Sequence, residues 1–117
     1  LERYREFLDD FPESEHSQIV TESMDVLRNK LAKKIFETGV LYMKMDEFEP
    51  ARMSFSAVID QYYDTDIMEQ VHFEVIKSYF KEGNIQKAEK HWVDKGQSYI
   101  SNEELINEIT ELLSSKQ

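Results

Sequence analysis

Residues 42–55 read YMKMDEFEPARMSF, and the spacing of their aromatic and small residues predicts a chain that turns back on itself. Within a helix, proline is best tolerated in the first turn, so a helix is expected to begin just before Pro50. Ala51 and Phe55 then share a face of this helix, because residues four apart are neighbours on a helix surface. The stretch therefore predicts a tight helical hairpin, in which Ala51 lets the backbones approach and Tyr42 and Phe55 come from opposite helices.

The turn of the hairpin carries the sequence DEFE at residues 46–49. We expect a capping box, in which Asp46 accepts hydrogen bonds from the first backbone N–H groups of the helix and Glu49 reaches back. One helix is therefore expected to end near Met45, and the next to begin at about Glu47.

Upstream of the hairpin, apolar residues recur at steps of three and four from about His16 to Met45. No proline interrupts this segment, and one helix tolerates the single glycine, Gly39. Such a helix would reach about 45 Å at a rise of roughly 1.5 Å per residue. Because that length is unusual in globular proteins, a partial break near residues 28–30 is an alternative.

Further turn signals divide the rest of the chain. YYDTD at residues 62–66 predicts a turn before a helix over 67–81, and Gly83 predicts a left-handed end to that helix. A helix over 85–98 is expected next, and SNEE at residues 101–104 predicts a second capping box before a final amphipathic helix. The candidates for the cap in the first of these turns are Asp64, Thr65 and Asp66.

The hairpin sequence occurs twice. GVLYMKMDEFEPARMSF, residues 39–55, aligns without gaps with IKSYFKEGNIQKAEKHW, residues 76–92. The offset is close to the ~34-residue period of tetratricopeptide repeats, which are helix–turn–helix units, and the first copy resembles that repeat at its Gly, Tyr, Ala and Phe positions. The alignment pairs Tyr42 with Tyr79, Phe48 with Ile85, Ala51 with Ala88, and Phe55 with Trp92.

We therefore expect an all-α fold, a tetratricopeptide-repeat solenoid of helix pairs with a long linking helix and a C-terminal capping helix. The chain of 117 residues fits one domain. A generic helical bundle with coincident spacings is the alternative. The expected parts are the end of a preceding repeat (1–12), a long helix plus repeat (16–62), a second repeat (66–98) and a capping helix (102–114).

A narrower resemblance covers roughly residues 4–92. DFPESEHS (10–17), VLRNKLAKKIFETGVLYMKMDEFEPA (26–51) and VIDQYYDTD (58–66) resemble a turn, a long linking helix and a second turn in the C-terminal half of the BamD family of outer-membrane β-barrel assembly lipoproteins. Tyr63 replaces the proline of that second turn. The resemblance implies a non-enzymatic protein–protein interaction scaffold on the periplasmic side of the bacterial outer membrane.

The resemblance also implies partners and an anchor. It implies docking on the periplasmic domains of BamA and on adjoining lipoproteins, and attachment to the membrane through an N-terminal lipid-bearing cysteine. The chain begins at Leu1 and has no cysteine, so we expect a piece of a longer protein. With a net charge of -10, we expect no nucleic-acid partner, and we expect no cofactor.

A partner-binding groove follows from the repeat register, because the first helix of each tetratricopeptide pair lines a concave surface. Its positions here are aromatic and basic, which suits binding by buried rings with lysines that orient the partner. The alternative is that neighbouring helices cover Phe36, Phe73 and Phe80. The candidate residues are Lys33, Phe36, Val40, Met43, Lys44, Gln70, Phe73, Lys77, Phe80 and Lys81.

Two other functions are alternatives. A chaperone-type adaptor would clamp peptide carboxylates, but such clamps need Lys and Asn at groove positions that hold Phe36 and Val40. A metal-dependent helical enzyme would use the ExxH spacings at residues 13–16 and 69–72, which place a carboxylate and an imidazole on one helical face. That site needs two further inward glutamates, and the chain has no Gly-rich phosphate loop or G-x-S-x-G motif. We therefore expect no metal site and no catalytic residue.

Overall fold

The computed structural model describes residues 15–114, with side chains from Ser23 onward, and every regular element in this part of the chain is helical. This confirms the all-α prediction, while the expected end of a preceding repeat at residues 1–12 lies outside the described part. The elements are α2 (Glu15–Lys44), α3 (Phe48–Gln61), α4 (Met68–Glu82), α5 (Ile85–His91), a π-helical turn η1 (Trp92–Gly96), α6 (Gln97–Tyr99) and α7 (Glu103–Ser114).

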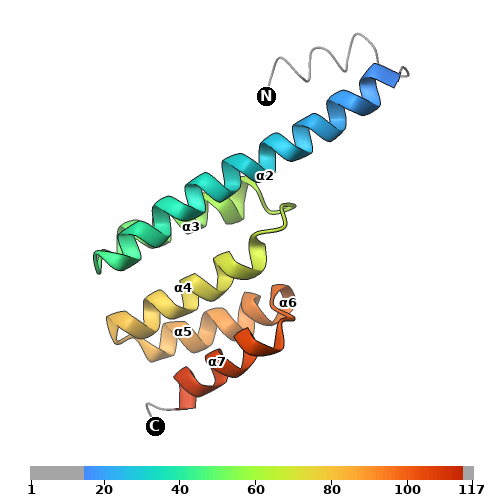
Figure 1. Ribbon diagram of the computed structural model, residues 1–117. Coiled ribbons are helices and arrows are strands. Elements are labelled where there is room, and N and C mark those ends of the chain that lie inside the picture. Colours follow the sequence, from blue (N-terminus) through green and yellow to red (C-terminus); the bar gives the residue numbers. More distant parts are fainter. Residues whose placement is uncertain (1–14, 115–117) are drawn as a thin grey trace.

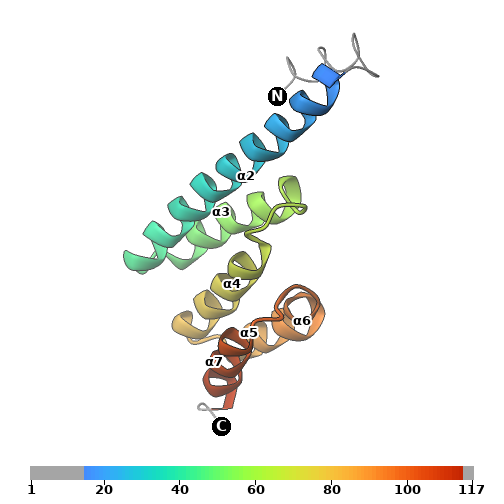
Figure 2. The ribbon, with the colours of Figure 1, turned by 45° about the vertical axis from the view of Figure 1, so that its right-hand side comes forward.

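Successive helices pack side by side into an elongated body that measures 58 × 27 × 19 Å (Figures 1 and 2). α3 lies against α2, and α4 lies against α3 and α5. α4 also contacts both α2 and α7. None of the helices within residues 15–114 has the length and apolar character needed to cross a membrane.

The long helix predicted from His16 to Met45 is confirmed as α2, which continues through residues 28–30 without a break. Its contact with α3 depends on Gly39, which is buried beneath the ring of Phe55. A methyl group at Gly39 would lie 2.8 Å from Phe55 Cδ1 and closer still to Cε1. Glycine therefore makes room for the ring, and the hairpin predicted from Tyr42 and Phe55 closes around this contact.

The capping box predicted from DEFE is wrong. α3 begins after Glu47, and no side chain caps it. Asp46 adopts a left-handed conformation with φ 58°. Its N–H donates to Met43 O at 3.1 Å, and the Glu47 N–H donates to Tyr42 O at 2.9 Å. The backbone itself closes this turn, and Asp46 does not occupy the cap position.

The predicted starts of α4 and α7 also need correction. The N-cap of α4 is Ile67, which makes no side-chain hydrogen bond, so none of the three expected polar residues caps that helix. At α7, Asn102 Oδ1 accepts the Leu105 N–H at 3.2 Å, whereas Ser101 donates its N–H to Glu69 Oε2 at 2.8 Å. Two of the suggested capping residues bond to distant residues instead: Asp64 to Arg28 and Ser101 to Glu69.

The end of α4 is as predicted, but the helix expected over 85–98 is interrupted. Gly83 has φ 90° in the left-handed region, and Asn84 Oδ1 accepts the Lys87 N–H at 3.1 Å to start α5. The π-helical turn η1 then separates α5 from α6. Gly96 is buried in this turn, where a methyl group would lie 2.8 Å from Trp92 Cε3.

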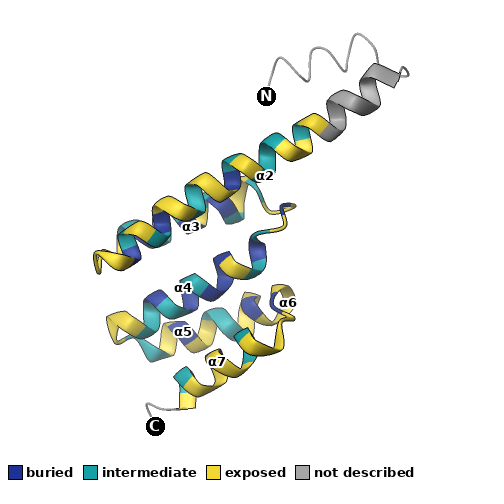
Figure 3. Ribbon diagram, viewed as in Figure 1, coloured by how far each residue is buried: buried dark blue, intermediate teal, exposed yellow. Residues whose placement is uncertain are grey.

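The buried residues form two core clusters along the body (Figure 3). The first fills the space between α2, α3 and α4, and Phe55 and Val58 are fully buried in it. The second lies between α4, α5 and α7, with Ile76 and Ile109 fully buried. The apolar side of α7 thus covers the second cluster, and its glutamates are exposed.

Replacing Ala51 or Ala88 with leucine should destabilise the fold by roughly 1–3 kcal/mol each, because both alanines are 0% exposed between packed helices and added methylenes strain a filled core. Urea-unfolding midpoints measure the effect. Unchanged midpoints for both variants would show that these positions do not form close helix contacts.

Candidate partner-binding groove

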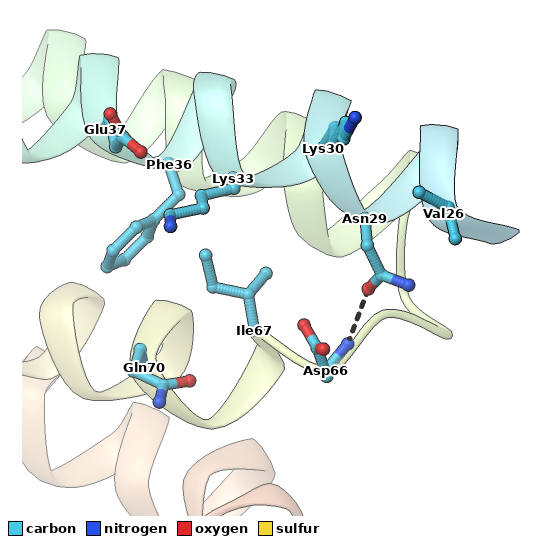
Figure 4. A pocket seen from close by; sticks show the side chains of 9 residues that line it. All are labelled: Val26, Asn29, Lys30, Lys33, Phe36, Glu37, Asp66, Ile67 and Gln70. Carbon is cyan, nitrogen blue, oxygen red and sulfur yellow. Dashed lines mark hydrogen bonds between the residues drawn. The ribbon is translucent and has the colours of Figure 1, made fainter.

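A hollow of about 760 Å³ opens between α2 and the start of α4 (Figure 4). Phe36 and Lys33 point from α2 toward α4, and Ile67 points back from the opposite side. Phe36 and Ile67 therefore give the hollow an apolar floor, and polar side chains surround it. Its lining residues are Val26, Asn29, Lys30, Lys33, Phe36, Glu37, Asp66, Ile67 and Gln70.

A second hollow of about 520 Å³ continues along the same helix. Lys33, Phe36, Val40 and Lys44 follow one another at steps of three and four, so the helical repeat places them on one face of α2. Phe36 lines both hollows. We refer to the two together as the α2 groove. The lining of the second hollow is Lys34, Phe36, Glu37, Thr38, Val40, Leu41 and Lys44.

Polar contacts hold one end of the groove in place. Arg28 Nη2 donates to Asp64 Oδ1 at 2.7 Å and to Gln61 O at 2.9 Å, and the guanidinium lies 5.1 Å from the ring centroid of Tyr62. The next residue, Asn29, accepts the Asp66 N–H at 3.1 Å (Figure 4). These bonds join α2 to the turn between α3 and α4, and so set the position from which α4 starts.

The Arg28–Asp64 pair also shifts the titration of both groups. The hydrogen bond to Asp64 raises the pKa of Arg28, and the same bond lowers the pKa of Asp64. Each ionised form is favoured by the other, so the pair stays charged near neutral pH.

Replacing Arg28 with alanine should lower the free energy of unfolding by about 1 kcal/mol, because it removes two hydrogen bonds, one of which is a solvent-screened ion pair. In a double-mutant cycle with Asp64→Ala, the coupling should be about 0.5–1 kcal/mol. Lys34→Ala, an exposed lysine on the same helix, is the matched control. Zero coupling would mean that the contact does not help to hold α2 against the turn.

The structure brings together about half of the residues predicted for the groove. Lys33, Phe36 and Gln70 line the first hollow, and Val40 and Lys44 line the second. Phe36 is half-buried, because its ring also packs on Phe55 at a centroid distance of 5.7 Å. Three further candidates, Lys77, Phe80 and Lys81, follow on α4 beyond the residues that line these hollows.

Two predicted groove residues are core residues instead. Met43 is 4% exposed in the first core cluster, and Phe73 is 8% exposed in the second. Lys77 Nζ lies 6.0 Å from the ring centroid of Phe73, and the ring itself is buried in the second core cluster. Repeat register gives the direction of a side chain but not what covers it, so for Phe73 the alternative of a covered ring is the one observed.

The α4 part of the predicted surface differs in charge from the α2 part. Burial raises the pKa of Glu74, while the nearby Lys77 and Lys81 lower it and Glu108 raises it further. The two lysines of α4 therefore lie near Glu74, and Glu108 of α7 adds a second carboxylate near that site. An anionic ligand would meet less positive charge here than along α2.

Several groove residues were not predicted. Lys30 and Glu37 lie one helical turn from Lys33, so helical spacing alone could have added them. Ile67 and Asp66 come from the turn before α4, and no local signal in the sequence links them to α2.

Of the two ExxH spacings considered as metal sites, the one at residues 13–16 lies outside the described side chains, and the one at 69–72 has other partners. Glu69 Oε2 accepts backbone N–H groups at the start of α7, whereas His72 Nδ1 lies 2.9 Å from His91 Nε2. The described residues contain no group of three or more His, Cys, Asp or Glu side chains arranged to hold a metal ion. Glu69 and His72 therefore bind different partners and do not face a common site.

A known family model matches most of the chain. The family model described as YfiO, outer membrane lipoprotein, matches residues 1–94. The matched part therefore includes α2 to α5 and ends within η1, and α7 lies beyond it. No curated protein matches the chain.

Proposed function

The chain belongs to the YfiO family of outer membrane lipoproteins, and from this we propose that it is a protein–protein interaction scaffold for outer-membrane protein assembly. The match over residues 1–94 confirms the resemblance to BamD-like lipoproteins, a non-catalytic family. We propose that this chain is likewise non-enzymatic and acts on the periplasmic side of the membrane. We also propose that it forms one domain, with a long helix plus repeat at residues 16–62, a second repeat at 66–98 and a capping helix at 102–114.

The α2 groove is the observation that carries the proposal. Small-molecule sites usually enclose most of their ligand, whereas this groove runs along a helix and stays open to solvent. Phe36 exposes part of its ring there, and the exposed Lys33 and Lys44 stand on either side of it. Partial ring burial with lysines around it suits a protein segment laid along the helix.

We propose the periplasmic domains of BamA, together with adjoining assembly lipoproteins, as the partners. The ring in the groove is the test site, because burying one aromatic ring contributes on the order of 2–3 kcal/mol and an exposed lysine contributes less. Phe36→Leu, which keeps apolar contact with Phe55, should weaken binding of the purified periplasmic domains more than Lys44→Ala does.

Calorimetric titration measures both affinities, and thermal melting of each variant shows whether it remains folded. Phe80→Ala against Lys77→Ala is a second comparison, on α4. If the folded Phe36→Leu variant binds these domains with wild-type affinity, the α2 groove is not the contact surface. The same result for Phe80→Ala would exclude Phe80 of α4 as a contact residue.

A further inference from the structure

The α2 groove carries a charge opposite to that of the protein as a whole. Between Val26 and Met45 the only acidic residue is Glu37, although the chain has a net charge of -10. The basic residues in this segment are Arg28, Lys30, Lys33, Lys34 and Lys44. Positive charge in an acidic protein is thus concentrated on the part of α2 that forms the groove, whereas the preceding part of the helix carries Glu15, Glu22 and Asp25.

The lysines of this segment form no ion pair within the described part of the chain. Arg28 is paired with Asp64, but no ion pair among residues 23–114 involves the four lysines, and all four are exposed. Lys30, Lys33 and Lys34 are three and four residues apart, so they are neighbours on the helix, where like charges repel. A bound anion would relieve this repulsion.

Apolar side chains lie among these lysines. Val26 is 56% exposed and Leu41 is 58% exposed, and Phe36 and Val40 are half-buried. Such a surface offers apolar contact and positive charge at the same time. A ligand that matches it carries both carboxylates and large apolar side chains.

We infer that the α2 groove binds an acidic segment of a partner protein, whose apolar side chains pack against Phe36 and Val40 and whose carboxylates contact the lysines of α2. This inference rests on the proposed scaffold function and specifies the chemistry of the partner. Glu37 and Asp66 also line the groove, and they favour a segment with separated carboxylates over a uniformly anionic membrane surface.

A second copy of the chain fits less well. α7 presents exposed glutamates, but its apolar side is already packed in the second core cluster, with Ile109 0% exposed. The helix would bring carboxylates to the groove without apolar side chains to fill it.

The test begins with selection of a displayed library of random short peptides on the full 117-residue chain. Enriched peptides should combine Asp or Glu with aromatic or aliphatic residues. Fluorescence anisotropy of one such peptide should show about tenfold weaker binding to Lys30→Gln/Lys33→Gln, and weaker binding as salt is raised. The matched control is Lys87→Gln/Lys90→Gln, exposed lysines on α5, which should bind as wild type.

Enrichment of neutral or basic peptides, or equal affinity of the two double variants, would overturn the inference. So would binding to phosphatidylglycerol vesicles in place of peptides, or self-association that Lys30→Gln/Lys33→Gln abolishes in sedimentation experiments. If the chain binds the purified BamA domains but selects non-acidic peptides, only this inference is overturned. If the chain does not bind those domains, the proposed scaffold function is contradicted.

Discussion

Replacing Phe55 with alanine is expected to lower the free energy of unfolding by about 3–5 kcal/mol, the usual range for removing a buried ring. Phe55 is 0% exposed, and its ring lies over Gly39 of α2 and beside Phe36. Alanine would leave a cavity at the contact that holds α2 to α3. The lost burial and the cavity both act against the folded state.

Urea unfolding followed by circular dichroism measures this change. Met53→Ala is the matched control, because Met53 lies on the same helix and is 70% exposed, and its effect should stay within about 0.5 kcal/mol. Similar midpoints for the two variants would contradict the packing described for α2 and α3.

The contact with Gly39 can be tested in the same series. Gly39→Ala should cost about 1–3 kcal/mol in the wild type, because its methyl group overlaps the Phe55 ring. In the Phe55→Ala background that cost should disappear or change sign, since alanine is better than glycine in a helix by about 1 kcal/mol. Additive effects would show that the ring does not lie over Gly39.

Acid is expected to destabilise the C-terminal half of the protein through a pair of imidazoles. His72 is 0% exposed, stacks on Tyr99 at a centroid distance of 4.5 Å, and places Nδ1 2.9 Å from His91 Nε2. Only one proton fits between these two nitrogens, so one ring donates and the other accepts. The other nitrogen, His72 Nε2, is buried without a hydrogen-bond partner among the described residues.

Both imidazoles are held neutral in the folded protein. Burial lowers the pKa of His72 to about 4, with smaller effects from His91 and Lys95, and burial together with Lys95 lowers the pKa of His91 to about 4 against the opposing Asp94. The unfolded chain takes up these protons near pH 6.5. Stability from the pair is therefore complete above about pH 6.5 and is lost as the pH falls toward 4.

These pKa values correspond to about 3 kcal/mol for each fully buried imidazole. Because His91 is partly exposed, the expected loss for the pair is on the order of 3–5 kcal/mol, and urea unfolding at a series of pH values between about 7.5 and 4.5 measures it. His91→Gln is the comparison, because it removes one titrating group and can still donate to His72; its dependence on pH should be shallower. The raised pKa of Glu74 acts in the opposite direction, but it is common to both proteins. An NMR titration that finds His72 protonating near pH 6.5 would contradict the expectation.

The predictions that succeeded depend on interactions between residues that are close together in the sequence. Apolar periodicity is a property of one helix, and it correctly gave α2 as a continuous element. The left-handed end at Gly83 follows from the conformational freedom of glycine. The family resemblance came from the same local motifs, and the match over residues 1–94 agrees with it.

By itself, then, the sequence determined an all-α chain, the position of its hairpin and the family to which it belongs. The tertiary structure decided the rest, because those features depend on partners that are distant along the chain. Packing of α4 against α7 buries Phe73 in the core, and Arg28 bonds to Asp64, which is 36 residues away along the chain. The energies of such contacts depend on the positions of whole helices, which no spacing within one segment encodes.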